Sequence, residues 1–196
     1  MTELSFRDRQ RVKLREVAET VIAGEGLPAA QARRIAGQAG CSVGTLYNIY
    51  GDIDQLILAA NETTLHDLAA ALERAAEGAR GASLEARLMA LAAGYLAFAS
   101  AHPFRWRAVF EQRLPDTYPV PTSYLEDRAR LLSFIERELD GTIGDARARA
   151  EAARALFSSV HGIVLLALDH KLGSFDEAAT ARQIGFVVGN VVRGVG

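Results

Sequence analysis

The sequence contains a single cysteine, Cys41, among its 196 residues. One cysteine cannot form an intramolecular disulfide, and it leaves no cysteine pair for a zinc knuckle, which fits a reducing compartment such as the cytoplasm. Long apolar runs are also missing. The longest one, residues 162–168, is far shorter than the ~20 residues that span a bilayer, and the charged N-terminus does not resemble a signal peptide. We therefore expect a cytoplasmic protein that has no membrane partner.

A strong net charge is missing too, since 22 basic residues oppose 24 acidic ones. This balance argues against a protein that coats nucleic acid by bulk electrostatics, although an average can hide a local patch. The first 15 residues do carry a surplus of positive charge. Its basic members are Arg7, Arg9, Arg11, Lys13 and Arg15. The charge asymmetry points to the N-terminus as a candidate contact surface for DNA.

Apolar residues recur at helical spacing throughout the chain, and no strand-like alternation interrupts them. Leu14, Val17, Ala18, Val21 and Ile22, for example, fall on one face of a helix that should end at Gly24 or Gly26. The pattern predicts an all-α fold. Further helices are expected over about residues 28–39, from 43 onward, over 52–75, and over 83–101, 103–113, 123–139, 145–172 and 175–195.

Residues 35–49 have the spacing of a helix-turn-helix. Ala36 is small enough for a second helix to cross close over it, and Gly40 can supply the positive φ of a tight turn. Ser42 can cap the second helix through its hydroxyl group. The apolar positions of the motif are expected to bury a shared core. They are Ile35, Val43, Leu46 and Ile49.

The polar face of this second helix suits a DNA major groove. Gly44 would let the backbone approach DNA, Thr45 could bond a phosphate or touch a thymine methyl group, and Tyr47 could reach a phosphate. Asn48 is the natural reader of adenine. From spacing alone, the alternative is a helical hairpin that merely has a polar face.

The complete stretch IAGQAGCSVGTLYNIY, residues 35–50, resembles the motif of the TetR family of transcriptional regulators. The resemblance implies a three-helix DNA-binding domain over residues 1–52 and a helical ligand-binding and dimerisation domain over residues 53–196. It also implies a double-stranded DNA operator, a small-molecule effector and a homodimer. The DNA-contacting residues expected from it are Arg33, Arg34, Ser42, Val43, Gly44, Thr45, Tyr47 and Asn48.

The chain departs from the family pattern at several positions. Tyr50 stands where the family usually has Phe, and Ala30 and Gln31 replace the usual threonines. Ile53, between two aspartates, stands where similar proteins place a lysine that contacts phosphate. Phosphate anchoring should therefore depend on the arginines near the motif and near the N-terminus, and DNA binding could be weaker or more sensitive to salt.

A second resemblance lies around Phe157, His161 and Gly162. It is similar to the C-terminal domain of TetR-like regulators that carry a Trp followed four positions later by His-Gly, with Phe157 in place of the Trp. His161 could line a pocket, titrate as a sensor, or donate a hydrogen bond within a helix crossing that Gly162 makes close. The structural role is favoured because one isolated histidine is seldom a ligand or a base.

The last two helices are expected to form the dimer. The final helix has a complete apolar stripe, with Gly185 and Gly189 on a neighbouring face that permits close helix approach, and the preceding helix is apolar on two sides. A four-helix bundle around a two-fold axis would cover both helices. The residues expected in this interface are Leu156, Val160, Ile163, Ile184, Val188 and Val192.

Aromatic residues gather in the C-terminal part of the sequence. Each alone is best read as core packing, but together with the resemblance they indicate an apolar pocket for an aromatic or amphipathic molecule. The expected lining residues are Tyr95, Phe98, His102, Trp106, Phe110, Tyr124, Phe157 and His161. The fourth helix is expected to transmit binding, because it alone would join this pocket to the DNA-reading head.

No set of residues in the sequence suggests catalysis. The four histidines are scattered, and no nucleophile–base pair, metal cluster or phosphate-cradling loop is evident, so we expect no enzyme activity, metal or cofactor. The favoured function is a repressor that a small apolar or aromatic effector releases from a palindromic operator. The alternative is a helical ligand-binding or interaction protein that has lost DNA binding, which Ile53 keeps open.

Overall fold

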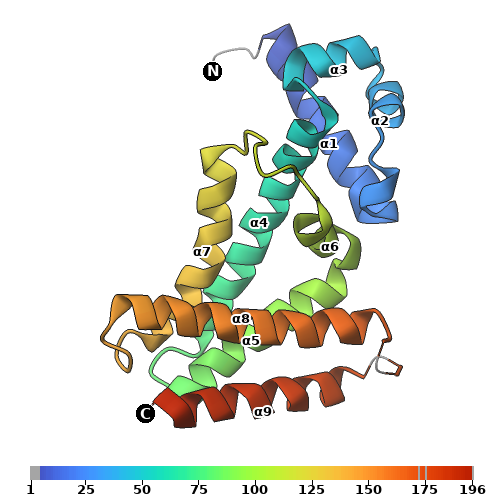
Figure 1. The fold of residues 1–196 in the computed structure, drawn as a ribbon. Coiled ribbons are helices and arrows are strands. Elements are labelled where there is room, and N and C mark those ends of the chain that lie inside the picture. The colour runs from blue at the N-terminus through green and yellow to red at the C-terminus, as the bar shows by residue number, and fades with distance from the viewer. Residues whose placement is uncertain (1–4, 172, 175, 196) are drawn as a thin grey trace. The chain divides into compact units, whose positions relative to one another are not determined.

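A computed structural model describes residues 5–171, 173–174 and 176–195, and over these residues it contains nine α-helices, one short 3-10 helix and no strand (Figure 1). The predicted all-α fold is confirmed. The predicted helix end at Leu172 and helix start at Phe175 lie outside the described residues. The helices are α1 (Phe6–Glu25), α2 (Ala32–Ala39), α3 (Val43–Tyr50), α4 (Ile53–Gly78), α5 (Leu84–Ala101), α6 (Pro103–Glu111), α7 (Thr122–Leu139), α8 (Ala146–Leu168) and α9 (Glu177–Val195).

The helices form two compact units. The first contains the described residues up to His66 together with His102–Asp127, and the second contains Asp67–Ala101 and the described residues from Arg128 onward. The domain boundary expected after residue 52 falls at the start of α4, inside the first unit. Three chain segments pass between the units, namely α4, the α5–α6 connection and α7. Between these two units α4 is therefore one of three connecting segments, and the role of α4 in transmitting ligand binding to the reading head stays a prediction.

The first unit has an apolar core built from α1 to α4. Leu14, Ala18 and Ile22 of α1 follow one helical face, as the spacing predicts, and all three are buried. They pack with buried residues of α2, α3 and the first half of α4, and with Ala108 of α6. Because α4 and α6 contribute to this core, the first half of α4 belongs structurally with the helix-turn-helix.

Helix α2 begins later than the sequence suggests. A 3-10 helix occupies Leu27–Ala29 with Pro28 in its first turn, and the α-helix starts only at Ala32. The N–H groups of Ala30 and Gln31 bond to the carbonyls of Leu27 and Ala29, which uses them in tight turns. A proline near a helix start therefore marked the short 3-10 turn rather than α2 itself.

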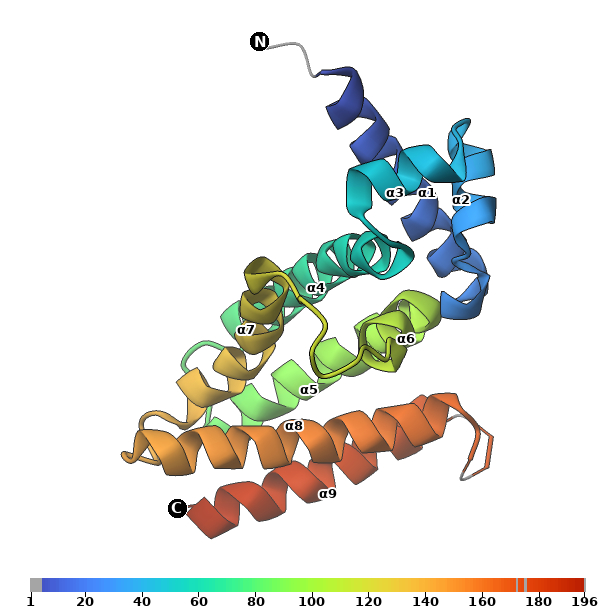
Figure 2. The ribbon, with the colours of Figure 1, turned by 45° about the horizontal axis from the view of Figure 1, so that its top comes forward.

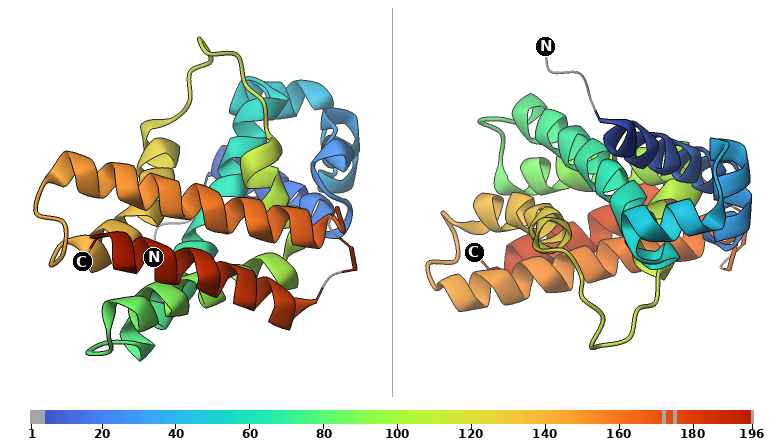
Figure 3. Two further views of the ribbon diagram at one scale, coloured as in Figure 1. Left: turned by 60° about the horizontal axis from the view of Figure 1, so that its bottom comes forward. Right: turned by 90° about the horizontal axis from the view of Figure 1, so that it is seen from above.

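In the second unit, α8 and α9 run antiparallel and side by side (Figures 2 and 3). Helix α9 also packs against α5 at its glycines. A Cβ atom added at Gly185 would lie 3.7 Å from the Met89 methyl group, and one at Gly189 would lie 3.2 Å from a carboxylate oxygen of Glu85. Both glycines therefore face side chains of α5, at ordinary contact distance for Gly185 and at a closer distance for Gly189. At Gly162, by contrast, nothing lies within 4 Å of an added Cβ, so the expected close crossing is absent within the described part of the subunit.

Helices α5 and α8 are, by length and composition alone, long and apolar enough to cross a membrane. The core helices of soluble proteins can be equally long and apolar, so this is weak evidence for a membrane segment. The apolar character of α8 is nevertheless informative. A smaller share of it is buried within the subunit than of α5, which leaves apolar surface on this helix.

Candidate nucleic-acid interface and apolar cavity

The turn between α2 and α3 has the predicted geometry. Gly40 has φ +71°, in the left-handed region, and its N–H donates to the Gly37 carbonyl at 3.1 Å. The N–H of Cys41 donates to the Ala36 carbonyl at 2.9 Å, and Ala36 itself is buried. These bonds satisfy carbonyls at the end of α2 that have no partner within the helix. The turn thus fixes how α3 leaves α2.

Helix α3 is capped by Ser42, as predicted. The Ser42 Oγ accepts a hydrogen bond from the Thr45 N–H at 3.1 Å and lies 2.9 Å from the Thr45 hydroxyl. Leu46 and Ile49 are buried in the core of the first unit. The helix has only eight residues, so this packing and the cap, rather than its own length, hold it in place.

The residues expected to contact DNA lie along one side of α3. Ser42, Gly44, Tyr47 and Asn48 are exposed, and 45% of the Tyr47 surface is accessible. Val43 and Thr45 are half-buried, since Val43 packs against the core and the Thr45 hydroxyl lies against Ser42. The structure therefore presents short and hydrogen-bonding side chains at the capped N-terminal end of α3.

The two arginines of α2 differ in their surroundings. Arg33 is exposed, whereas Arg34 makes a two-pronged ion pair with Glu25, with one nitrogen–oxygen distance of 2.9 Å. Hydrogen bonding to Arg34 lowers the pKa of Glu25, and the same bond raises the pKa of Arg34. A phosphate would have to compete with Glu25 for this guanidinium group. Arg33 is the better candidate for a phosphate contact.

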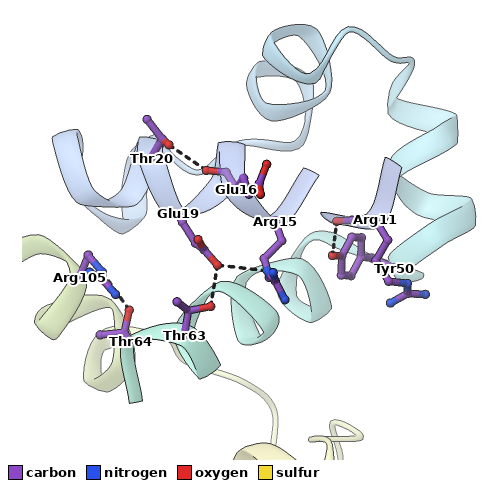
Figure 4. A network of polar contacts seen from close by, with 9 residues as sticks. All are labelled: Arg11, Arg15, Glu16, Glu19, Thr20, Tyr50, Thr63, Thr64 and Arg105. Carbon is purple, nitrogen blue, oxygen red and sulfur yellow. Dashed lines mark hydrogen bonds and ion pairs between the residues drawn. The ribbon is translucent and has the colours of Figure 1, made fainter. Parts of the chain in front are cut away.

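The C-terminal end of α3 is bonded to α1. Arg7 donates to the Asn48 carbonyl at 3.2 Å, and Arg11 donates to the Ile49 carbonyl at 2.7 Å. The Tyr50 hydroxyl donates to the Arg11 carbonyl at 2.8 Å, and the Arg11 guanidinium lies 4.9 Å from the centre of the Tyr50 ring (Figure 4). Burial raises the pKa of Tyr50, which keeps its hydroxyl group protonated as a donor. The sequence identified these arginines as basic but did not reveal their partners.

The N-terminus of α4 is held by the connection between α6 and α7. Asp52 accepts bonds from the Gln55 N–H at 2.9 Å, which confirms the predicted cap, and from the Tyr118 hydroxyl at 2.5 Å. Gln55 does not complete a capping box, because its side chain donates to the Pro119 carbonyl. Burial and the bond to Asp52 raise the pKa of Tyr118. Ile53 packs against the apolar core, so no cation stands at this position.

A second polar network links α1 to α4. Glu19 accepts a hydrogen bond from the Thr63 hydroxyl at 2.7 Å and pairs with Arg15 at 3.2 Å (Figure 4). Thr64, next along α4, accepts a bond from Arg105 of α6 at 3.4 Å. These contacts tie the first half of α4 to α1 on one side and to α6 on the other.

The eight residues expected to line a ligand pocket are divided between the two units. His102, Trp106, Phe110 and Tyr124 belong to the first unit. There, Trp106 and Tyr124 are buried, and the rings of Trp106 and Phe110 lie 5.8 Å apart. The burial of Trp106 and Tyr124 is as expected for aromatic residues that pack in a core, and neither lines the cavity described below.

Tyr95, Phe98, Phe157 and His161 belong to the second unit. The Tyr95 ring meets the Phe157 ring edge-on at 5.7 Å, and its hydroxyl lies 2.7 Å from the His161 Nδ1. His161 also stacks on Phe157 at 5.7 Å. Burial lowers the pKa of His161, so its neutral form is favoured. His161 therefore shares a hydrogen bond with Tyr95 between α8 and α5, and the tautomer of the imidazole decides which of the two donates.

Tyr95 and Phe157 line an apolar cavity of about 40 Å³ in the second unit. The other lining residues are Leu72, Leu88, Leu91, Ala92, Leu131, Phe134, Ile135, Leu156, Val160 and Val188. A cavity of this size has room for one or two water molecules rather than for a drug-sized ligand. Any larger ligand would require these helices to move apart.

Four of the residues expected in a dimer interface are buried within the second unit itself. They are Leu156, Val160, Ile184 and Val188. Ile163 and Val192 are half-buried. The apolar surface that α8 and α9 leave open includes Leu166, which is 39% exposed, and Phe186, which is 73% exposed. A partner helix would therefore contact exposed residues of α8 and α9, and most of the residues expected in the interface are not among them.

Residues 88–185 match the family model described as the tetracyclin repressor-like C-terminal domain, and this match spans half of the chain. The chain belongs to the TetR family. The match covers α5 to α8 almost completely and the first half of α9, which is most of the second unit together with α6 of the first. No curated protein matches the sequence.

Solved structures share the TetR fold over nearly the whole chain. A protein of unknown function from Rhodococcus sp. RHA1 is 26% identical, with 95% of each chain covered and a TM-score of 0.74. A TetR-like transcriptional regulator from the same organism is 21% identical, with 99% of this chain and 100% of that chain covered and a TM-score of 0.66. The regulator FadR from Bacillus subtilis, solved with stearoyl-CoA, is 16% identical, with 94% and 99% covered and a TM-score of 0.67.

The chain thus has the fold of a TetR-family transcriptional regulator, with an N-terminal helix-turn-helix and a helical C-terminal part. The family description names a repressor-like domain, and both of these named neighbours are transcriptional regulators. The subtype with a Trp-His-Gly signature stays a prediction.

Proposed function

We propose that this protein is a cytoplasmic repressor that binds a palindromic operator as a homodimer and leaves it when a small apolar or aromatic effector binds. The observation that carries the proposal is the exposed side of α3, where Ser42, Gly44, Tyr47 and Asn48 follow a capped helix start. Short and hydrogen-bonding groups at the N-terminal end of such a helix suit a major groove. Arg33 adds an exposed positive charge nearby on α2.

The operator should have two-fold symmetry because the protein is proposed to bind it as a dimer. The open apolar surface of α8 and α9 supports a second copy as the partner, since it includes Phe186 and Leu166 on the two helices that pack together. A two-fold dimer would present two copies of α3 to successive major grooves, about 34 Å or somewhat more apart.

The proposed effector site is the apolar cavity of the second unit. Its lining is apolar apart from the Tyr95 hydroxyl, which is bonded to His161. This composition favours a hydrocarbon or aromatic group, and the stearoyl-CoA bound by FadR is an apolar-chain ligand on the same fold. Because the cavity holds only about 40 Å³, an effector would have to favour a more open state of these helices.

Such a preference has a thermodynamic consequence. An effector that binds both states equally well would shift nothing, whereas one that prefers the DNA-incompetent state lowers DNA affinity. Coupling of ~1–3 kcal/mol corresponds to a loss of about 5- to 150-fold. Operator DNA must weaken effector binding by the same factor.

An electrophoretic mobility shift with duplex DNA from around the protein's own coding region tests the proposal. We expect a discrete complex that mixed-sequence competitor DNA displaces only poorly. The substitution Tyr47→Ala should weaken this complex. The alternative is a helical ligand-binding protein without DNA binding, favoured by Ile53 and by the two flanking aspartates at the start of α4. Equal binding to all DNA, or none, together with an intact fold, would favour that alternative.

A further inference from the structure

Helix α3 ends in carbonyl groups that need donors from elsewhere. The last four carbonyls of an α-helix have no partner within the helix, and an eight-residue helix has few bonds of its own. The Gly51 N–H takes the Tyr47 carbonyl at 2.8 Å. The next two carbonyls, of Asn48 and Ile49, accept bonds from Arg7 and Arg11 of α1.

Positive charge at this end of α3 also suits the helix dipole. The last turn of α3 contains no basic residue of its own, so α1 supplies both cations. The shorter of the two bonds, from Arg11, is partly buried. A half-buried bond between a guanidinium group and a carbonyl is stronger than one in open solvent.

Arg11 and Tyr50 hold each other in place. The Arg11 side chain donates to the Ile49 carbonyl and covers the Tyr50 ring. The Tyr50 hydroxyl donates to the Arg11 carbonyl in return (Figure 4). The residue that replaces the usual Phe of the family motif thus supplies the returning hydroxyl. The closed set of contacts fixes the end of α3 against one turn of α1.

We propose that Arg11 and Tyr50 are positioning residues for DNA reading, and that Arg11 acts through α3 rather than on a DNA phosphate. This role rests on the proposed function of α3 as the recognition helix. Asn48, the proposed base reader, is one residue before the carbonyl that Arg11 holds. A small rotation of α3 about its end would move the Asn48 side chain relative to the base edges.

Positioning and phosphate anchoring make different predictions. Loss of a phosphate contact weakens binding to all sequences about equally. It also lowers the salt slope, which is the slope of log K against the logarithm of the salt concentration, by about one. Loss of a positioning contact should instead weaken binding to the preferred site and leave binding to mixed-sequence DNA and the salt slope unchanged.

The experiment uses the full chain and two DNA duplexes of equal length. One carries the site that the wild-type protein enriches from a random duplex library, and the other has mixed sequence. Dissociation constants are measured at several salt concentrations for wild type, Arg11→Lys, Tyr50→Phe and the control Arg33→Ala. Circular dichroism checks that each variant keeps its helical content.

Arg11→Lys keeps the charge but loses the planar group that covers Tyr50. We expect about a tenfold loss of affinity for the enriched site, with mixed-sequence binding and the salt slope as in wild type. Tyr50→Phe, which removes one hydroxyl, should give a smaller loss of about fivefold in the same direction. Arg33→Ala should weaken both duplexes alike and lower the salt slope by about one.

Wild-type specificity in both Arg11→Lys and Tyr50→Phe would overturn the positioning role, and so would equal weakening of both duplexes by Arg11→Lys. If Arg11→Lys loses helical content, the Tyr50→Phe variant alone is used. Wild-type specificity in the Tyr50→Phe protein would then overturn the positioning role. A wild-type protein that enriches no sequence would overturn the proposed function itself, whereas the other outcomes leave that function intact.

Discussion

The Tyr95 hydroxyl and the His161 Nδ1 lie 2.7 Å apart, joining α5 to α8 beside the apolar cavity. His161 is half-buried, and burial lowers its pKa below the 6.5 of an unperturbed histidine. Between the two pKa values the unfolded chain binds a proton that the folded chain does not. Neutral His161 therefore contributes its full stability above about pH 6.5, and this contribution is lost as the pH falls below that value.

We predict that the thermal midpoint falls between pH 7.5 and pH 5.5 partly because of His161. In His161→Gln, which cannot titrate, the drop should be smaller than in wild type. Thermal unfolding followed by circular dichroism at both pH values measures this difference. The same drop in both proteins would show that His161 has no part in the pH dependence.

A substitution at Gly40 tests whether the turn before α3 needs a residue with positive φ. Its φ of +71° is costly for a residue with a Cβ, so Gly40→Ala should destabilise the fold by about 1–2 kcal/mol. The matched control is Gly37→Ala, because Gly37 lies within α2 and an added Cβ there meets nothing within 4 Å. The control should be neutral or stabilising by about 0.5–1 kcal/mol. Urea unfolding of the two variants measures the contrast, and equal effects would contradict it.

Substitutions on the apolar surface of α8 and α9 test whether this surface forms the proposed dimer. Phe186→Asp places a charge on an exposed position and should give a folded monomer. Val188→Asp, in contrast, buries an unpaired charge beside the cavity and should unfold the protein rather than merely separate subunits. Leu125→Asp, at another exposed apolar position, is the control that should leave the assembly unchanged.

Sedimentation with circular dichroism separates these outcomes. A Phe186→Asp protein that sediments like wild type would remove Phe186 from the interface. A folded monomeric Val188→Asp protein would contradict the burial of Val188 within its own subunit.

Local features of the fold were predictable from the sequence, because their causes lie within a few residues. Gly40 with its positive φ and Ser42 as a helix cap are examples, as are the buried apolar positions of α3. A turn glycine and a capping hydroxyl act on neighbouring backbone groups, so sequence spacing identifies them.

Features that depend on distant partners were not predictable. The apolar stripe of α9 indicated that Val188 is buried. Periodicity alone cannot show whether such a residue is buried in its own subunit or in an interface with a second copy. The partners of Arg11 and Tyr118 lie 38 and 66 residues away, and no local pattern indicates them. The aromatic residues were recognised as a group, but the division of Trp106 and Tyr95 between two units required the structure.

Helix α3 is proposed to read an operator through Asn48. The most direct measurement compares wild type and Asn48→Ala on the enriched site and on duplexes that carry each single base change, with footprints of both proteins. The account predicts a two-fold footprint and, in Asn48→Ala, a loss of preference at one base position per half-site, worth about 1–3 kcal/mol. An asymmetric site bound by a monomer, or an Asn48→Ala protein with unchanged base preference at every position, would contradict it.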